Sequence, residues 1–299
     1  VVDAETGEYL SGEAFVPQNW AEGLDENGRP IEKPEARYGE TPFMQNPGPL
    51  GAHNWQPMAF NPDLGLVYIP AQEAPEFYAV DRLFKTRAQN WNTGTSLPAG
   101  IPMDLDLATA MAIRATLKGR LIAWDPIAQE ARWSVEHLNA WNGGVLSTAG
   151  GLVFQGRLEG DFAAYNASTG EKLWRHNVKA GAASGPGTFE IDGEQYVTIT
   201  TGWGSAYALA GGSAYDQPVP PIVGKVVTFK LGATETIPDH NLVMAPRTPK
   251  TDKFGDQEML QTGLEQYHYN CRVCHGPLAI SSGVLPDLRW SAISANADA

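Results

Sequence analysis

Ala164-Tyr165-Asn166-Ala167-Ser168-Thr169-Gly170-Glu171-Lys172-Leu173-Trp174 repeats, 41 residues later, a stretch that runs from Ala123-Trp124-Asp125 to Ala131-Arg132-Trp133. Both fit the pattern Ala-x-(Asp/Asn)-x7-Trp. The Asp or Asn opens a turn, and a glycine such as Gly170 supplies φ > 0, so that the chain returns as a second strand. Repeats of about 40 residues with these signals indicate blades of a β-propeller. The alternative, two coincidental hairpins, is disfavoured by the shared alanine, turn and tryptophan.

Two further stretches resemble the turn of this repeat. Val1-Val2-Asp3-Ala4-Glu5-Thr6-Gly7-Glu8 begins in the same way and lacks the tryptophan, and Asn61-Pro62-Asp63-Leu64-Gly65-Leu66-Val67-Tyr68 is a looser echo. Asp125 and Asn166 are therefore interpreted as turn residues, not as catalytic groups. Short runs of apolar and β-branched residues between turn signals predict strands at 119–124, 151–155, 161–165, 195–201 and 224–231.

Composition agrees with many short strands. Gly 32 and Pro 22 together make 54 of 299 residues, which is above the average share and favours a chain with many turns. This length allows two domains. We expect an all-β class, with propeller blades over 1–232, a linker rich in Pro and Thr over 233–250, and a second domain over 251–299. Residues 81–116 are irregular and predict a long insertion that covers a site.

The charge balance excludes some partners. With 21 basic and 34 acidic residues the net charge is −13, and no basic stripe is present, so nucleic-acid binding is disfavoured. No apolar run approaches the length that spans a membrane. No signal peptide is visible, and because the sequence begins at Val1 without a methionine this absence carries no information.

Cys271-Arg272-Val273-Cys274-His275 contains both cysteines of the chain. Cys-x-x-Cys-His is the pattern of covalent c-type haem attachment, in which two thiols bond the haem and the adjacent imidazole binds the iron. Cys271 and Cys274 are thus predicted to hold a haem, with His275 as its axial ligand. Such a haem moves single electrons and places the mature protein outside the cytoplasm, most simply in a bacterial periplasm.

The same pair of cysteines has other interpretations. A redox dithiol precedes a helix in a thioredoxin-like unit, which is not found around Cys271, and a zinc site needs two more ligands, for which no third cysteine exists. Leu260, Leu264, Tyr267 and Cys271 share one face of a predicted helix, as a small cytochrome domain requires. After His275 there is no methionine or histidine to serve as the second axial ligand of the iron. We interpret this as a truncated cytochrome domain; the alternative is a five-coordinate haem.

Further short motifs follow one another along the chain. They are Gly51-Ala52-His53-Asn54-Trp55-Gln56-Pro57-Met58, Asn61-Pro62 with Gly65-Leu66-Val67-Tyr68-Ile69-Pro70, Leu121-Ile122-Ala123-Trp124-Asp125-Pro126, Trp141-Asn142-Gly143-Gly144, Val153-Phe154-Gln155-Gly156 and Gly202-Trp203-Gly204. Their order and the haem pattern resemble the PQQ-dependent quinohaemoprotein alcohol dehydrogenases (type II), over essentially the whole chain. This chain resembles the C-terminal portion of such an enzyme.

The resemblance implies a fold and a reaction. Members of this family are periplasmic eight-bladed propellers that carry pyrroloquinoline quinone (PQQ) and Ca²⁺, followed by a cytochrome c domain. A small alcohol gives its electrons to the quinone and leaves as an aldehyde. The electrons pass to the haem and then to an external acceptor such as a copper protein or a cytochrome. PQQ supplies the difficult chemistry, and the protein supplies position and polarisation.

The resemblance also carries over a few residues. Asn54 and Trp55 match an Asn-Trp pair that contacts PQQ, where an amide can bond oxygen atoms and an indole offers a flat wall. Ala206 matches a position whose backbone lies against the cofactor. Trp141 and Asn142 are expected to line the same mouth. Each could instead be an ordinary turn or core residue. Only the agreement of these motifs with the family's order favours a role in cofactor binding.

Other family features are expected upstream of Val1. They are the general base, the Ca²⁺ ligands, a vicinal disulfide and further PQQ contacts, so no catalytic residue is predicted in this chain and we expect it to be inactive alone. His53, His137 and His240 are interpreted as structural. The competing interpretation of the whole chain is a propeller scaffold without quinone, which serves with its cytochrome as a binding or electron-transfer module.

Overall fold

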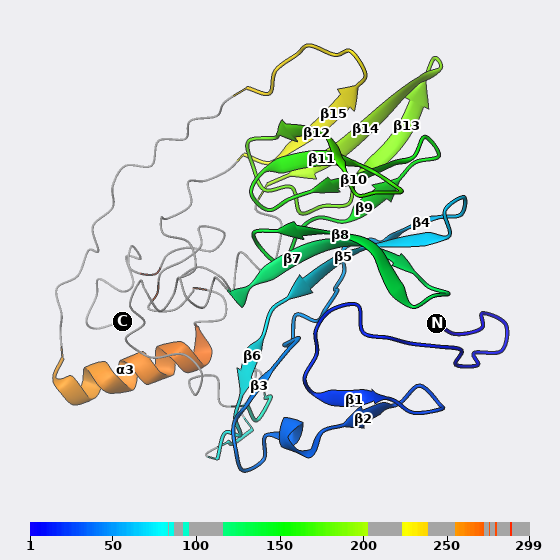
Figure 1. Cartoon of the computed structure of the whole chain (residues 1–299). Helices are drawn as coiled ribbons and strands as arrows, with labels where there is room; N and C mark the ends of the chain where they lie inside the picture. The colour runs from blue at the N-terminus through cyan, green and yellow to red at the C-terminus, as the bar shows by residue number, and fades with distance from the viewer. Residues whose placement is uncertain are drawn as a thin grey trace.

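The computed structural model describes residues 1–82, 84–86, 92–95, 116–202, 223–238 and 255–271, together with residues 275, 279 and 288. The regular secondary structure of this part of the chain is mainly antiparallel sheet (Figure 1). The predicted insertion at 81–116 and linker at 233–250 lie for the most part outside the described residues.

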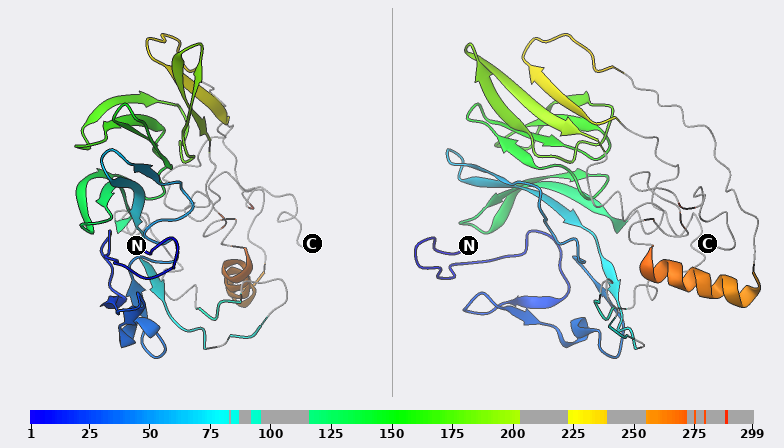
Figure 2. Two further views of the ribbon diagram at one scale, coloured as in Figure 1. Left: turned by 90° about the vertical axis from the view of Figure 1, so that its right-hand side faces the viewer. Right: turned by 180° about the vertical axis from the view of Figure 1, so that it is seen from behind.

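Three sheets stand side by side and form the main body. The first has the order β4(Ala59–Asn61)-β5(Leu66–Glu73)-β7(Lys118–Asp125)-β8(Glu130–His137), and the second the order β9(Val145–Ser147)-β10(Leu152–Gly156)-β11(Asp161–Asn166)-β12(Lys172–Asn177). The third is β13(Gly187–Ile191)-β14(Glu194–Thr201)-β15(Lys225–Lys230). Their fan-like arrangement is visible in Figures 1 and 2. All five predicted strands are confirmed, as β7, β10, β11, β14 and β15.

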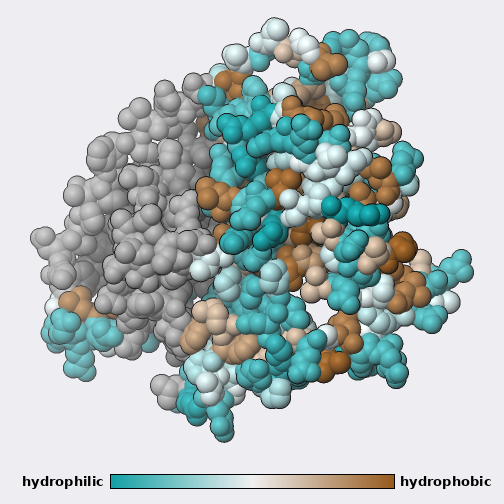
Figure 3. Space-filling view, viewed as in Figure 1, coloured by the Kyte–Doolittle hydropathy of each residue, from teal (hydrophilic) through white to brown (hydrophobic). Residues whose placement is uncertain are grey.

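Smaller elements complete the described part. β1(Ala21–Leu24) pairs with β2(Pro30–Glu32), and β3(Phe43–Gln45) pairs with β6(Glu76–Tyr78). A short 3-10 helix η1 (Pro34–Arg37) and the helix α3(Gln257–Asn270) are the described helical elements. The surface seen in Figure 3 is mainly hydrophilic, with apolar patches scattered between.

The repeat found in the sequence has one structure in both copies. Ala123 pairs with Trp133 across β7 and β8, and Ala164 pairs with Trp174 across β11 and β12. The register shifts directly after the alanine in each hairpin. The two stretches are therefore equivalent parts of consecutive sheets, and the repeat is confirmed.

The four turns share one construction. The carboxylate or amide oxygen of the first residue accepts the backbone N–H groups two and three residues further on, as an Asx turn does. These distances are 3.0 and 2.8 Å for Asp3, 3.0 and 3.1 Å for Asn61, 2.9 and 2.9 Å for Asp125, and 2.8 and 3.1 Å for Asn166. The predicted turn role of Asp125 and Asn166 is thus confirmed.

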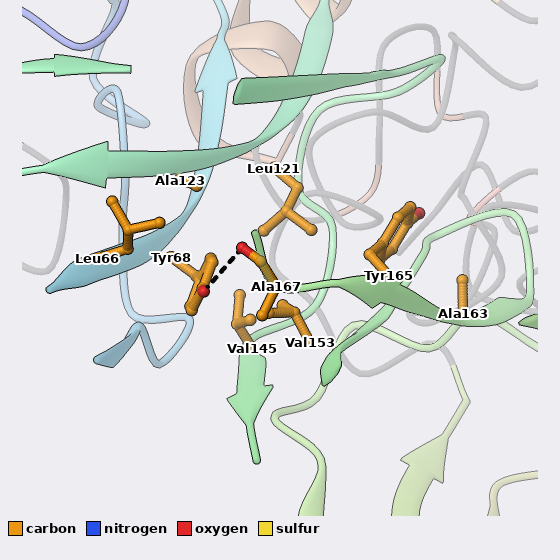
Figure 4. Packing of buried hydrophobic residues seen from close by; sticks show 9 residues of the cluster. All are labelled: Leu66, Tyr68, Leu121, Ala123, Val145, Val153, Ala163, Tyr165 and Ala167. Carbon is orange, nitrogen blue, oxygen red and sulfur yellow. Dashed lines mark hydrogen bonds between the residues drawn. The ribbon is translucent and has the colours of Figure 1, made fainter. Parts of the chain in front are cut away.

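The tryptophan of the repeat packs against the next sheet. Trp133 of β8 donates from Nε1 to the carbonyl oxygen of Ala167 at 3.0 Å, and the hydroxyl of Tyr68 donates to the same oxygen at 2.9 Å. Figure 4 shows the second bond within a buried cluster that joins the two four-stranded sheets. Because Tyr68 and Ala167 are fully buried, these bonds satisfy polar groups in the interior.

Candidate functional site

The pair Asn54-Trp55 lies in the loop between β3 and β4. Asn54 Nδ2 donates to the carbonyl oxygen of Leu50 at 3.0 Å, and its Oδ1 accepts the Trp55 backbone N–H at 2.9 Å. An amide has two N–H groups and two lone pairs, so these bonds leave one of each for a ligand. The Trp55 side chain is 51% exposed. The pair can therefore offer a hydrogen-bonding amide beside an open aromatic wall.

This loop is fastened to the first sheet through β5. The imidazole Nδ1 of His53 lies 3.1 Å from the carbonyl oxygen of Pro70. The backbone N–H of Gln72 donates to Ala52 O at 2.8 Å. The buried Gln72 side chain also donates from Nε2 to Leu50 O at 2.9 Å. His53 thus has a structural partner, as predicted.

Pro57 marks the point where segments of all three sheets meet. A Cβ atom built on Gly144, just before β9, would lie 2.4 Å from Pro57 Cδ, and one on Gly185, just before β13, would lie 2.6 Å from Pro57 Cγ. The Val145 N–H donates to Pro57 O at 2.8 Å. These glycines are required because the backbone approaches closely there. The Asn54-Trp55 loop therefore ends at the inner edges of the sheets.

Trp141 and Asn142 lie in the connection between β8 and β9, and both are buried. The Trp141 backbone N–H donates to Gln72 Oε1 at 3.0 Å. Asn142 Nδ2 donates to Asn139 O at 2.7 Å. Gln72 thus bridges the loop of Asn54 and the connection that carries Trp141, so these two predicted parts of the mouth are neighbours. Asn142 supports its own backbone and is not exposed.

Gln155 of β10, in the second sheet, holds the same connection and is itself bonded to the buried His137 at the end of β8. His137 Nε2 lies 2.8 Å from Gln155 Oε1, and Gln155 Nε2 donates to Gly143 O at 2.9 Å. Since Gln155 uses its N–H₂ group on Gly143, its oxygen accepts, and His137 Nε2 carries the proton. Burial lowers the pKa of His137 below its usual value, and the bond to Gln155 opposes this shift. A neutral structural histidine agrees with the prediction.

Gly202 begins the Gly-Trp-Gly motif at the end of β14. Its N–H donates to Gly181 O at 2.8 Å. Gly181 lies four residues before Gly185, which approaches Pro57. Trp203, Gly204 and Ala206 lie outside the described residues. The predicted backbone contact of Ala206 therefore stays a prediction.

The Cys-x-x-Cys-His motif begins directly after α3. The presence of α3 confirms the predicted helix before this motif. Asp256 caps the start of α3 by accepting the Met259 N–H at 2.8 Å. At the other end, Cys271 N donates to Tyr267 O at 2.8 Å and His275 N donates to Cys271 O at 2.9 Å. Cys271 is a free, partly buried cysteine, and Cys274 lies outside the described residues. The bond between His275 N and Cys271 O therefore holds these two residues close together.

Within the described ranges, no group of three or more His, Cys, Asp or Glu side chains is placed to hold a metal ion. In the same part of the chain, no helix has the length and hydropathy needed to cross a membrane.

Two supporting residues, Gln72 and Gln155, were not predicted as part of the site. Each is a glutamine in a strand that is otherwise largely apolar, within Leu66–Glu73 and Leu152–Gly156. An amide in such a run is a signal, because a buried polar group requires hydrogen-bond partners. The sequence cannot identify those partners, which lie far away along the chain.

Comparison with known proteins shows what the chain is similar to along most of its length. Residues 106–197 match the family model described as the PQQ glucose/ethanol/alcohol dehydrogenase beta-propeller domain. The quinohemoprotein alcohol dehydrogenase of Comamonas testosteroni is 39% identical over 97% of this chain and 40% of its own length. Quinohemoprotein alcohol dehydrogenase ADH-IIG of Pseudomonas putida is 41% identical over 97% of this chain and 41% of its own length.

Solved structures agree with these relatives. The structure of the Pseudomonas putida quinohemoprotein alcohol dehydrogenase ADHIIG matches with a TM-score of 0.87 at 38% identity, over 97% of this chain and 43% of that one. The Comamonas testosteroni enzyme matches with a TM-score of 0.77 at 37% identity, over 98% and 42%.

Residues 106–197, which carry strands β7 to β13, belong to a PQQ-type β-propeller domain. Quinohaemoprotein alcohol dehydrogenases are homologues of the chain along nearly its whole length, which confirms the resemblance seen in the motifs. The chain spans about 40% of the length of these relatives.

Proposed function

We propose that this chain works within a PQQ-dependent alcohol dehydrogenase that oxidises small alcohols to aldehydes and passes the electrons to its own c-type haem. The observation that carries the proposal is the Asn54-Trp55 loop, which ends at Pro57 where segments of three sheets meet, in a chain that also carries Cys-x-x-Cys-His after a helix. A copper protein or a cytochrome is the proposed external acceptor, and the periplasm the proposed location.

The residues present fit PQQ, which is a flat ring system with quinone and carboxylate oxygens. The open side chain of Trp55 provides a flat wall, and the remaining N–H and lone pair of Asn54 suit those oxygens. Asn54 and Trp55 would hold the cofactor, with the backbone at Ala206 against the ring. When bound, PQQ supplies the two-electron oxidation of the alcohol. Asn54 and Trp55 orient it, and the Pro57 contact fixes their loop.

Cys271 and Cys274 would bond the haem, and His275 would bind its iron. The bond from His275 N–H to Cys271 O supports this role, since it holds these two residues close together. We propose propeller blades over 1–232, a linker over 233–250 and a cytochrome c segment over 251–299. In this proposal, the general base and the Ca²⁺ ligands belong to the part of the enzyme outside this chain. Residues 1–299 are then inactive alone.

A second function is a propeller with cytochrome that binds or transfers electrons and has no quinone. The combination of an exposed Trp55 and an Asn54 amide that keeps one N–H and one lone pair for a ligand favours the enzyme, because a pure scaffold does not need them beside the Pro57 contact.

The test is PQQ binding by the full-length protein that contains this chain, measured from the change in PQQ absorbance. We expect Asn54→Ala and Trp55→Ala to weaken binding about tenfold, the effect of one lost hydrogen bond or ring contact to the cofactor. Asn27→Ala in the exposed β1–β2 turn and Trp174→Phe on the outer strand β12 are matched controls. A wild-type protein that binds no PQQ would favour the scaffold, whereas equal PQQ binding by all four variants would remove Asn54 and Trp55 from the cofactor site.

A further inference from the structure

Gln72 occupies an unusual place for an amide. It lies near the end of β5, is only 2% exposed, and faces Gly119 on β7. Its Nε2 donates to Leu50 O at 2.9 Å, and its Oε1 accepts the Trp141 N–H at 3.0 Å. Both ends of one side chain are thus bonded to backbone groups of two different segments.

These bonds join the two parts of the candidate site. The Leu50 carbonyl oxygen that accepts from Gln72 also accepts from Asn54 Nδ2 at 3.0 Å, and Asn54 Oδ1 holds the Trp55 N–H. An unbroken series of hydrogen bonds therefore runs from Trp141 through Gln72 and Leu50 to Asn54 and Trp55. A shift at Gln72 changes the position of both segments.

The connection around Trp141 depends on such support. Trp141 has φ +64°, a left-handed conformation that is costly for a bulky residue and persists only where its surroundings fix it. The connection also lies directly on β7, since a Cβ atom on Gly119 would come within 2.2 Å of Asn139 O. Gln155 holds the other end at Gly143 O. Of the two glutamines that hold this connection, Gln72 is the one that also bonds the Asn54 loop, through Leu50 O.

We propose that Gln72 is a positioning residue that sets the relation between the Asn54-Trp55 pair and the Trp141 connection, and thereby the affinity of the site for PQQ. This inference rests on the proposed function. Gln72 acts through Leu50 and Asn54 and does not itself touch the cofactor. An amide is required because one end must donate and the other accept.

The experiment uses the full-length protein with two readouts. Hydrogen exchange of the Trp141 backbone amide, measured without PQQ, reports the bond to Gln72 Oε1. PQQ titration reports the site. Gln72→Met keeps the side-chain volume and removes both bonds, whereas Gln72→Glu keeps the acceptor for Trp141 and loses the donor to Leu50. Gln18→Met is the control, because Gln18 makes similar bonds to Trp20 and Ala21 beside β1, away from the site.

We expect Gln72→Met to speed Trp141 exchange and to raise the PQQ dissociation constant about tenfold, as for a buried N–H left unpaired. Once ionised, Gln72→Glu should keep the Trp141 protection yet still weaken PQQ binding, because a carboxylate accepts from Trp141 N–H and cannot donate to Leu50 O. Gln18→Met should change binding less than twofold. Combined with Asn54→Ala, the Gln72→Met effect should be clearly smaller than in the wild type, since both act on one series of bonds.

Two results would overturn the assignment in different ways. Unchanged PQQ affinity in Gln72→Met, or effects of Gln72→Met and Asn54→Ala that simply multiply, would remove the positioning role and leave the proposed function standing. A wild-type protein that binds no PQQ would overturn the proposed function together with this inference.

Discussion

The indole ring of Trp133 lies directly on Gly170 of the neighbouring sheet. A Cβ atom built on Gly170 would come within 2.6 Å of Trp133 Cε3 and 2.8 Å of Cδ2. Trp133 belongs to the first copy of the repeat and Gly170 to the turn of the second. The same glycine therefore serves two purposes: its φ of +74° closes the turn, and its missing side chain makes room for the ring of the preceding blade.

Substitution at Gly170 should be more harmful than at an equivalent turn. Gly170→Ala combines left-handed strain of about 1–2 kcal/mol with overpacking of about 1–3 kcal/mol. Gly65→Ala, at the same place in the Asn61 turn, has φ +66° and no neighbour within 4 Å, so only the strain applies. Hydrogen exchange of the hairpin amides in the full-length protein measures both. Equal losses in the two variants would contradict the packing role of Gly170.

The shared carbonyl of Ala167 predicts coupled effects. Tyr68→Phe and Trp133→Phe each remove one of its two donors, and the single loss of a hydrogen bond costs about 0.5–1.5 kcal/mol. The double variant leaves the buried oxygen without a donor among the described residues, which adds about 1–3 kcal/mol. We therefore expect a loss in stability that exceeds the sum of the singles in thermal unfolding. Additive losses would mean that Ala167 finds another partner.

Tyr68 should also resist ionisation. Burial raises its pKa from 10.0 to about 12. Because the unfolded chain loses this proton first, the contribution of Tyr68 to stability is complete below pH 10 and is lost as the pH rises towards 12. Ultraviolet titration of the phenolate band should give the same curve for the wild type and Tyr68→Phe below about pH 11. A difference between the two curves near pH 10 would show that Tyr68 is accessible.

The burial of His137 should make the stability of the fold sensitive to acid. Burial lowers its pKa from 6.5, so the unfolded chain takes up this proton first as the pH falls. Its contribution to stability is present above about pH 6.5 and is lost below it. Thermal midpoints between pH 7.5 and 5 should therefore fall more steeply for the wild type than for His137→Gln. A fall in His137→Gln as steep as in the wild type would contradict the role of the buried imidazole.

The turn residues should be exchangeable between copies. Asp125→Asn and Asn166→Asp keep the acceptor for the two backbone N–H groups, so each should change stability by less than about 0.5 kcal/mol at pH 7. Asp125→Ala and Asn166→Ala lose it and should each cost about 1 kcal/mol, by analogy with helix N-caps. Thermal unfolding compares the four variants. A large cost for the swaps would show that charge, not the Asx turn, selects the residue.

The repeat could be predicted because its signals are local. Turn, alternation and tryptophan all lie within one hairpin, and both hairpins form as expected with Ala123 opposite Trp133 and Ala164 opposite Trp174. The short strands β1, β2, β3 and β6 have little buried apolar surface and gave no signal. Pro70 within β5 also argues against a strand, because proline has no N–H to donate to a neighbouring strand. β4 pairs with β5 only as far as Tyr68, so no hydrogen bond to β4 is lost at Pro70.

The site was predictable only in part. Asn54 and Trp55 were recognised from motif order, and Cys271 with His275 from their spacing. Gln72 was not, because its partners Leu50 and Trp141 are 22 and 69 residues away and only the folded sheet brings them together. The local bonds of the Asn54 amide likewise depend on the loop geometry, which no pattern in the sequence specifies.

The most direct test of the account is the absorbance spectrum of the haem in the PQQ-loaded, full-length protein after a small alcohol is added without any other reductant. We predict that the reduced-haem band appears in the wild type, is abolished by Cys271→Ser with Cys274→Ser, and is strongly slowed by Asn54→Ala and Trp55→Ala. A haem that stays oxidised in the wild type, although PQQ and alcohol are present, would contradict the proposal that this chain carries electrons from a quinone to a c-type haem.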